Sequence, residues 1–425
     1  MRGVVPCAKV NNFSRGRRSC GGRRSSIMKK MLKAAAVLAA MVMAFTLGAC
    51  SDGNGGEKHD GNPLVKKYGE GEHTVDDVFE ILIYGDDYVV LTKYTGTEEN
   101  VTIPDGVTKI SGAFHDCTSV KKITIPNSVT DIDHAFHDCI SLESVEIGSG
   151  VTTIGKYAFE GCTSLVSVTI PNNVTTIGSW AFKDCTSLES VTILDGVTEI
   201  DFAAFWGCES LKSVTIPGSV TEIGSEAFWN CKSLKSVIIP NSVTTIGSWA
   251  FDGCESLESI TIPNSVTEIG NSAFWGCKSL KSVTISNSVT TIDYHTFLGC
   301  KSLKSVTIPD SVTHIGDGAF SGCSSLTSVT IGSGVTSIGI YAFSSCTNLK
   351  SVKIPDSVET IESSAFYACS ALTSVTFTDT MGWYATKNNL YIDGESINVS
   401  NPETNATNLK NATGDWYLKS LYKKK

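Results

Sequence analysis

A unit of 23 residues recurs along most of this chain, and the repetition constrains the fold more than any other feature. From Cys139 to Cys369 a cysteine returns at every 23rd residue. Cys117 lies 22 residues before Cys139, because the first two repeats lack one residue before their Ala-Phe pair. A clear copy, LKSVIIPNSVTTIGSWAFDGC, runs from Leu234 to Cys254. Self-similarity at a period of roughly 20 to 50 residues is the signature of a stacked array.

Each unit contains two short extended pieces followed by a compact turn. In the copy above, the residues before Pro240 alternate between polar and apolar, which predicts a brief strand that the proline ends. An Asn-Ser pair then forms a turn. Two aliphatic residues pack inward, and Gly247 lets the chain bend. The spacing of Ala250, Phe251 and Cys254 indicates one turn of α-helix or 3₁₀ helix.

A single unit cannot cover its own apolar face, so neighbouring units must stack and share a core. We therefore predict a repeat solenoid of the leucine-rich-repeat type, with about 12 repeats of 23 residues over 100–379. Short parallel strands form one face of each coil. Turns, 3₁₀ helices or one-turn α-helices form the other.

An open stack needs a cap at each end. Residues 75–99 are the predicted N-terminal β cap, because Val78–Tyr84 and Tyr88–Thr92 flank Gly-Asp-Asp in the pattern of a β-hairpin. Residues 380–425 form the predicted C-terminal cap or tail, whose aromatic and aliphatic residues are expected to pack on the final coil as strands or loops.

The order Leu-x-x-Val-x-Ile-Pro, Val-x-x-Ile-Gly, Ala-Phe and Cys resembles the BspA-type leucine-rich repeats of bacterial surface proteins. The resemblance covers roughly residues 100 to 380. It implies a surface adhesin that binds host matrix proteins or other bacteria. Because one repeat fold serves many roles, the resemblance specifies the fold more sharply than the function.

The N-terminus has the pattern of an export signal. Lysines follow Met28, an apolar run extends from Ala34 to Leu47, and Leu-Gly-Ala-Cys ends at Cys50. The run is too short for a membrane-spanning helix but suits a signal peptide. Its ending resembles the lipobox of bacterial lipoproteins, which implies lipidation of Cys50 and removal of residues 1–49. The alternative is an ordinary secretory signal with a chance cysteine.

Residues 1–27 are rich in arginine and do not fit a lipoprotein signal, so Met28 is the predicted start. A twin-arginine signal at Arg23-Arg24 is the alternative, although the Ser-Ser-Ile that follows departs from that motif. Residues 50–74 begin with a stretch of Gly, Asp and Asn that cannot build a core, and they are predicted to be a flexible tether. The expected location is the bacterial cell envelope, lipid-anchored at the outer membrane or cell surface.

Composition argues against several classes of function. A formal net charge of −9 and a pI near 5.4 argue against a nucleic-acid partner, which needs clustered positive charge. Neither a phosphate-binding loop nor a carboxylate pair stands out, so we predict no catalytic residue, no cofactor and no metal. The tail of about 45 residues contains no histidine or cysteine, which makes an envelope enzyme subunit the weakest alternative.

The cysteines and histidines have structural interpretations. Each of the twelve repeat cysteines takes the same inward position, which predicts a ladder of buried thiols that act as small hydrophobes. Bridges between adjacent coils are the alternative, because equivalent positions can approach disulfide distance. His115, His134 and His137 cluster in the first two repeats, where exposed variable positions are favoured over a metal site.

Two surfaces are candidates for binding. On the strand face, outward serines and threonines form ladders beside a row of charged residues, namely Lys212, Lys235, Glu258, Lys281 and Lys304. This face is the usual docking surface of leucine-rich repeats by analogy, and a merely solvated sheet is the alternative.

The second candidate is an aromatic band beside the Ala-Phe pairs. Trp180 and Trp249 precede Ala-Phe, whereas Trp206, Trp229 and Trp275 follow the phenylalanine. Other coils have Lys, Ser, Asp or Glu there, so the core does not require an aromatic residue. These tryptophans form either a ligand-contacting ridge or packing between coils.

The sequence thus predicts a cell-surface lipoprotein that acts as a non-enzymatic interaction or adhesion module. The expected partner is a host matrix or bacterial surface protein, or a glycan, with membrane contact only through the lipid anchor and the protein itself a monomer. The alternative is an envelope structural protein or an antigenically variable surface protein.

Overall fold

A computed structural model describes residues 61–85, 87–386, 395–396, 398–410 and 420–423 of the chain. These residues belong to one compact unit, Asp60–Lys425. The signal segment 1–49, the lipidation site Cys50 and the first part of the expected tether lie outside the described residues.

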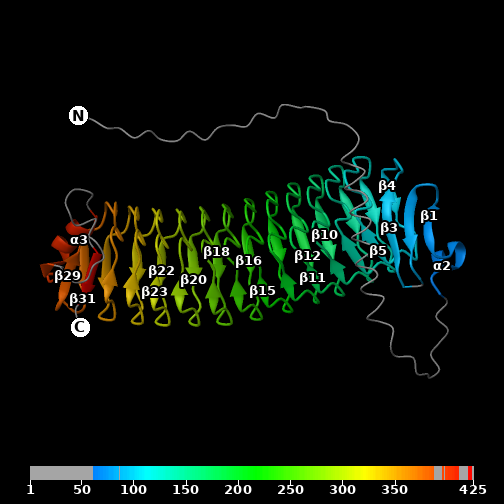
Figure 1. Cartoon of the computed structure of the whole chain (residues 1–425). Helices are drawn as coiled ribbons and strands as arrows, with labels where there is room; N and C mark the ends of the chain where they lie inside the picture. Colours follow the sequence, from blue (N-terminus) through cyan, green and yellow to red (C-terminus); the bar gives the residue numbers. More distant parts are fainter. Residues whose placement is uncertain (1–60, 86, 387–394, 397, 411–419, 424–425) are drawn as a thin grey trace, which may run out of the picture. The chain divides into compact units, whose positions relative to one another are not determined.

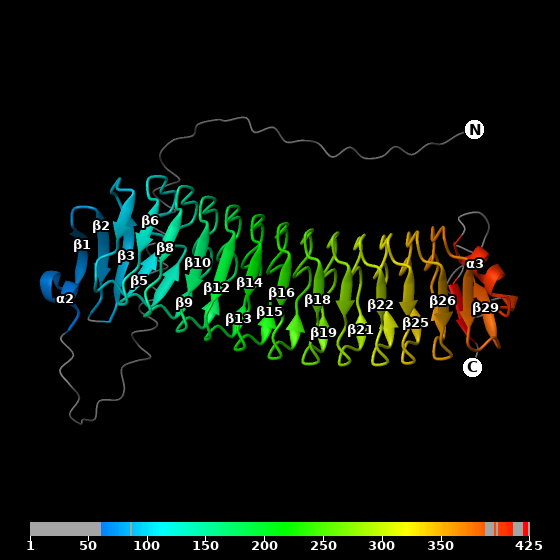
Figure 2. The ribbon, with the colours of Figure 1, turned by 180° about the vertical axis from the view of Figure 1, so that it is seen from behind.

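Each coil contributes a first strand to a parallel ladder, as the Ser-Val-Thr pattern predicts (Figures 1 and 2). The pairing keeps the repeat period, so that Val191 of one coil lies opposite Val214 of the next. The described residues contain thirteen such strands: β4 Asn100–Thr102, β6 Lys122–Thr124, β8 Ser144–Glu146, β10 Ser167–Ile170, β12 Ser190–Ile193, β14 Ser213–Thr215, β16 Ser236–Ile238, β18 Ser259–Thr261, β20 Ser282–Thr284, β22 Ser305–Thr307, β24 Ser328–Thr330, β26 Ser351–Ile354 and β28 Ser374–Phe377.

A second parallel ladder runs along another side of the coils, where the sequence indicated an extended piece but not a sheet. It joins the Thr-Ile or Glu-Ile pairs, for example Thr245↔Glu268. Its strands in the repeats are β5 Lys109–Ser111, β7 Asp131–Asp133, β9 Thr153–Ile154, β11 Thr176–Ile177, β13 Glu199–Ile200, β15 Glu222–Ile223, β17 Thr245–Ile246, β19 Glu268–Ile269, β21 Thr291–Ile292, β23 His314–Ile315, β25 Ser337–Ile338 and β27 Thr360–Ile361. The predicted solenoid of short parallel strands is confirmed, with strands on two sides of each coil.

The Ala-Phe segment forms turns rather than a 3₁₀ helix or a one-turn α-helix. Its backbone also bonds to the next coil: Phe251 N–H donates to Ala273 O at 2.8 Å, and Gly253 N–H donates to Trp275 O at 2.8 Å. This third set of inter-coil hydrogen bonds alternates with bonds inside the turn, such as that from Cys254 N–H to Phe251 O at 3.2 Å. The backbone groups are thus satisfied partly within the coil and partly by its neighbour, and no continuous helix forms.

Two residues of this turn have left-handed backbone conformations in successive coils. The residue before the cysteine is Gly253 in one coil (φ 71°) and Asn230 in another (φ 56°), residue types that tolerate this region. The residue before the alanine is also left-handed and includes Trp249 (φ 54°) and Glu226 (φ 59°). The turn thus imposes its conformation on whatever residue the second position holds.

Gly247 has a different role from the one the sequence indicated. A Cβ built on Gly247 would lie 2.4 Å from the Ser225 nitrogen and 2.6 Å from the Gly224 carbonyl carbon in the preceding coil. Its φ is not in the left-handed region. The glycine therefore lets two backbones approach closely, and its role is not to bend the chain.

The core is a stack of identical layers. From Phe136 to Phe366 the phenylalanine rings of neighbouring coils have centroids 5.0 to 5.4 Å apart and planes within 17° of parallel. The leucine, valine and isoleucine of each coil, with Ala and Cys, are buried around the rings. Because each layer covers the next, no coil has a core of its own.

The repeat cysteines are free thiols in the structure, and all except the partly exposed Cys117 are buried. Each buried thiol donates to the phenylalanine carbonyl of the preceding coil, as Cys254 Sγ does to Phe228 O at 3.3 Å. Burial raises the pKa of Cys323 to about 12 and raises that of Cys254 well above its ordinary value. The thiol ladder thus adds a hydrogen bond to the core filling that the sequence predicted.

The N-terminal cap extends the second-strand ladder. Strands β2 Phe79–Ile83 and β3 Val89–Tyr94 are antiparallel, which confirms the predicted hairpin. β3 pairs with β5 in parallel. A further strand, β1 Gly71–Val75, and the helix α2 Pro63–Tyr68 precede the hairpin. Within the described residues, the part of the expected tether from residue 63 onward is therefore ordered, because Leu64 is buried against the cap.

The C-terminal cap closes both ladders. β31 Ser420–Lys423 pairs with β27 and with β29 Trp383–Thr386, and β29 also pairs with β30 Glu395–Ser396. The helix α3 Pro402–Lys410, which the sequence did not indicate, lies against β28. Asn405 of this helix donates to Val375 O at 3.0 Å.

Among the helices of the described residues, none has the length and apolarity needed to span a bilayer.

We expect alkylation to distinguish Cys117 from the eleven buried repeat cysteines. In the native protein at pH 8, iodoacetamide should modify Cys117 much faster than the others, because a buried thiol with a raised pKa supplies little thiolate. Peptide mass spectrometry reads each site, and a sample unfolded in guanidinium should show all twelve modified. Equal native rates, or disulfide-linked repeat peptides, would contradict the thiol ladder.

Candidate binding surface

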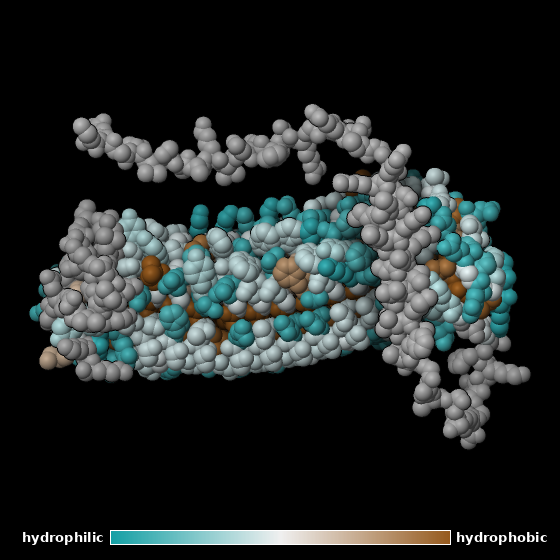
Figure 3. Space-filling view, viewed as in Figure 1, coloured by the Kyte–Doolittle hydropathy of each residue, from teal (hydrophilic) through white to brown (hydrophobic). Residues whose placement is uncertain are grey.

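The strand face carries the residues that the sequence placed there. The outward positions of the first strands are exposed, including Ser213 and Thr215 of β14. Ile238 takes a threonine position in β16 and is 80% exposed. Much of the face visible in Figure 3 is hydrophilic or neutral, with hydrophobic surface confined to a narrow line and isolated spots.

The charged row on this face is exposed and partly paired along its length. Lys212 pairs with Glu189 at 2.8 Å and Lys281 with Glu258 at 2.6 Å, in each case between adjacent coils. Lys235 and Lys304 are exposed in the same row. Exposed pairs of this kind contribute about 0 to 1 kcal/mol each, so the row is better suited to solubility than to fixing one partner.

The aromatic band consists of two rows of side chains, one on each side of the Ala-Phe pair in the sequence. We call the position before alanine the pre-Ala row and the position after phenylalanine the post-Phe row. Trp180 and Trp249 lie in the pre-Ala row, whereas Trp206, Trp229 and Trp275 lie in the post-Phe row. The two rows flank the Ala-Phe pair in the sequence, and their side chains reach the surface to different extents.

At one end of the band the tryptophans are packed. Trp180 stacks on Tyr157 at 5.0 Å between ring centroids and meets Phe202 edge-on. Trp206 stacks on Trp229 at 4.9 Å, and the Lys183 ammonium lies 4.6 Å from a Trp206 ring centroid. For Trp180 and Trp206 the geometry therefore favours packing between coils.

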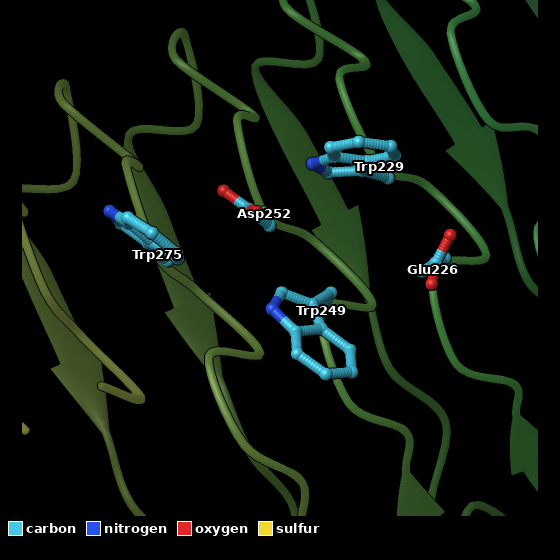
Figure 4. A pocket seen from close by; sticks show the side chains of 5 residues that line it. All are labelled: Glu226, Trp229, Trp249, Asp252 and Trp275. Carbon is cyan, nitrogen blue, oxygen red and sulfur yellow. The ribbon is translucent and has the colours of Figure 1, made fainter. Parts of the chain in front are cut away.

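Further along the band, Trp249 and Trp275 are each 39% exposed and line a pocket of about 210 Å³. Trp229 completes the aromatic wall. Figure 4 shows Asp252 between Trp229 and Trp275, with Trp249 beside it and Glu226 at the other end. The structure thus brings three of the five predicted tryptophans together around a single cavity.

Sequence reasoning missed the two carboxylates of this pocket. Glu226 belongs to the pre-Ala row and Asp252 to the post-Phe row, so both occupy the variable positions that had already singled out the tryptophans. Comparing the two rows side by side would have placed both acids next to the tryptophans of adjacent coils. The extent to which each side chain is exposed could be known only from the structure.

Burial controls the electrostatics of both acids. It raises the pKa of Asp252 to about 6, although a hydrogen bond from the Trp229 indole partly opposes the shift. It also raises the pKa of Glu226, whose charge adds to the effect on Asp252. A desolvated carboxylate in a cleft costs folding free energy, and such groups concentrate at functional sites.

The histidines do not form a comparable site. His115 stacks on His137 at 4.7 Å, and His137 contacts Glu160 at 3.0 Å, whereas His134 lies against Tyr157. In the part of the chain that the structure describes, no group of three or more His, Cys, Asp and Glu side chains is arranged to hold a metal ion.

We expect Asp252→Asn to stabilise the protein at neutral pH. The pKa of Asp252 in the folded chain, about 6, lies above its ordinary value of 3.8. Folding therefore favours the protonated carboxyl, and this contribution to stability is lost as pH rises from about 4 to above 6. The variant should gain roughly 1 kcal/mol at pH 8, a value discounted for partial exposure, and nothing at pH 4.

Thermal unfolding at pH 4 and pH 8 measures this difference. Asp310→Asn is the contrast, because hydrogen bonds from Ser333 lower the pKa of that exposed carboxyl and its effect should have the opposite sign. An Asp252→Asn variant that is no more stable than the parent at pH 8 would show that the pocket does not disfavour its charge.

Comparisons with known proteins agree with this architecture. A family model described as the BspA type leucine rich repeat region (6 copies) matches residues 93–212, 198–325 and 267–392. A leucine-rich repeat protein from Bacteroides ovatus is 30% identical over 71% of this chain and 88% of its own, with a TM-score of 0.57. A leucine rich cell surface protein from Faecalibacterium prausnitzii is 28% identical over 73% of this chain and 95% of its own, with a TM-score of 0.40. The search among curated proteins gives no significant match. The family model covers well over half of the sequence, and the chain therefore belongs to the BspA-type leucine-rich repeat family.

Proposed function

We propose that this protein is a lipid-anchored surface module that binds another protein through its aromatic band. The observation that carries the proposal is the pocket, where exposed tryptophans surround carboxylates that folding disfavours as charged groups. Tryptophan is the residue type most enriched at the energetic centres of protein interfaces. A partner that neutralises these partly buried acids would remove the free-energy cost that their charges impose on folding.

Family membership supports a role of this kind. Proteins with BspA-type repeats are cell-surface proteins, and their repeat arrays generally mediate protein interactions rather than catalysis. An open array offers a long surface on which a partner can make many contacts along successive coils. The proposed partner is a host matrix protein or a protein on another bacterial cell.

The strand face is the competing location on the same molecule. It is exposed and regular, but its charges are partly paired between coils. Its exposed large apolar side chains in the described residues are few and separate, with Ile238 and Val166 the examples on the strands and the charged row. A partner on that face would have few buried anchors. The aromatic band therefore has the stronger physical case.

Biolayer interferometry with the purified protein tests the proposal against a panel of matrix proteins and bacterial surface proteins. We expect at least one partner to bind. Replacing the three pocket tryptophans, Trp229, Trp249 and Trp275, together by alanine should weaken that binding at least tenfold, since interface tryptophans of this kind contribute about 2 kcal/mol or more.

The matched control reverses charges on the strand face, in the variant Lys212→Glu, Lys235→Glu, Lys281→Glu. This control should bind like the parent. If it loses binding while the tryptophan variant does not, the interface is the strand face. If no panel member binds, the adhesion proposal fails.

We further propose that Cys50 carries the lipid that holds the module on the membrane. Replacement by serine should abolish incorporation of a labelled fatty acid and move the protein from the detergent phase to the aqueous phase in Triton X-114. Cys20→Ser is the matched control, because it lies in the segment before Met28 and should change neither result. Unchanged labelling of Cys50→Ser would exclude the lipobox interpretation.

A further inference from the structure

In the post-Phe row, a short aspartate stands between two tryptophans at the pocket. Trp206 and Trp229 stack directly on each other at 4.9 Å, but the next coil has the short Asp252 before Trp275 follows. Trp229 and Trp275 are therefore two coils apart, which corresponds to roughly 10 Å because neighbouring strands lie about 4.8 Å apart. That separation leaves room for one flat group between the two indoles.

The space is a small depression that is partly open to solvent. At about 210 Å³ the pocket is smaller than the roughly 300–1,000 Å³ of sites that hold drug-sized ligands. It suits a single side chain that enters from a partner.

The charges of the pocket restrict the occupant to a cation. Asp252 and Glu226 both line the space, and burial raises the pKa of both. Within the described part of the chain, no Lys, Arg or His forms an ion pair with either acid. Three indole rings complete the wall, and indoles attract cations to their faces. A cation would compensate the two partly buried charges and also gain contacts with the rings.

Elsewhere in the post-Phe row, the chain itself supplies a cation that contacts both a carboxylate and an indole. In three consecutive coils the post-Phe row has Glu160, Lys183 and Trp206. The Lys183 ammonium pairs with Glu160 at 2.7 Å and lies over Trp206 at 4.6 Å. Around Asp252 the carboxylates and indoles are present, but the lysine is not.

We propose that the pocket formed by Glu226, Trp229, Trp249, Asp252 and Trp275 receives the guanidinium group of an arginine exposed on the partner protein. This inference rests on the proposed function and adds the chemistry of the residue that is recognised. A guanidinium is favoured over an ammonium because it is planar, stacks on aromatic faces and pairs with carboxylates through two parallel hydrogen bonds. A neutral sugar would stack on the indoles but leave both carboxylates uncompensated.

A titration with small peptides tests the proposal directly. The full chain, labelled with ¹⁵N at its seven tryptophans, is titrated with acetyl-Gly-Arg-Gly-amide and followed through the indole N–H signals. The signals are assigned by single Trp→Phe variants. We expect the arginine peptide to shift Trp229, Trp249 and Trp275 and to leave Trp180 unchanged.

Two comparison peptides separate charge from shape. The citrulline peptide has nearly the shape of the arginine peptide without its charge, and it should bind at least tenfold more weakly. The lysine peptide carries the charge without the planar group and should fall between the two. Equal binding of the citrulline and arginine peptides would overturn the proposal, as would a neutral oligosaccharide that shifts the same indoles when the arginine peptide does not.

Two variants test the carboxylates. The double variant Asp252→Asn, Glu226→Gln should lower the affinity for the arginine peptide at least tenfold, while its melting temperature at neutral pH stays at or above that of the parent and the indole signals outside the pocket are unchanged. The matched control Glu189→Gln, Glu258→Gln removes two carboxylates from the strand face and should bind like the parent. Undiminished binding by the pocket variant refutes the proposal.

The partner panel separates this inference from the proposed function. If a panel protein needs the tryptophans but binds the pocket carboxylate variant as tightly as the parent, the proposed function stands and the arginine site fails. If the arginine peptide binds as expected but no panel protein does, the site stands and the adhesion proposal fails.

Discussion

Stacking of equivalent layers is the interaction on which the rest of this structure depends. Each coil has few residues and no closed core, so its apolar side chains are buried only because the next coil covers them. The parallel phenylalanine rings, the thiol-to-carbonyl hydrogen bonds and three sets of inter-coil backbone bonds all follow the same period. The missing residue in the first two repeats lies before the Ala-Phe pair, and the Phe114 and Phe136 rings still lie 5.1 Å apart, so the stack keeps its inward positions there.

The same constraint produces the surface pattern. Because the core fixes the positions of Ala, Phe and Cys, the residues beside them recur at regular intervals and differ only in side chain. Aromatic or charged residues at these positions therefore lie side by side in rows without any cost to the core. Most combinations become paired or stacked within the chain, as Glu160, Lys183 and Trp206 do. Around Asp252 the described part of the chain supplies the carboxylates and the indoles, but no lysine that pairs with them.

Much of the fold could be predicted from the sequence, because the period and the inward pattern are local signals that repeat many times. The repeat solenoid, its first strands and the buried cysteine positions all follow from them, whereas the N-terminal hairpin followed from the two strand-like segments on either side of Gly-Asp-Asp. The turn at Ala-Phe was predicted less well, since some of its backbone N–H groups, such as that of Phe251, bond to the next coil and interrupt the helical pattern. The reason for Gly247 was also missed, because close approach between coils does not appear in one repeat. The helix α3 lies outside the repeats and had no periodic signal.

The candidate site was predicted in part. Its tryptophans stood out as variable positions, but which of them are packed and which are exposed depends on neighbours one and two coils away, so Trp206 and Trp249 could not be distinguished. The importance of Asp252 depends on its burial, which a sequence does not display.

The most direct test of the account is hydrogen–deuterium exchange of the protein with and without a bound partner. The account predicts that a partner slows exchange in the turns that contain Trp229, Trp249 and Trp275. Exchange in the first strands of the same region, β14, β16, β18, β20 and β22, should be unchanged. Slowed exchange confined to the strand-face edges of those coils, with the tryptophan turns unaffected, would contradict it.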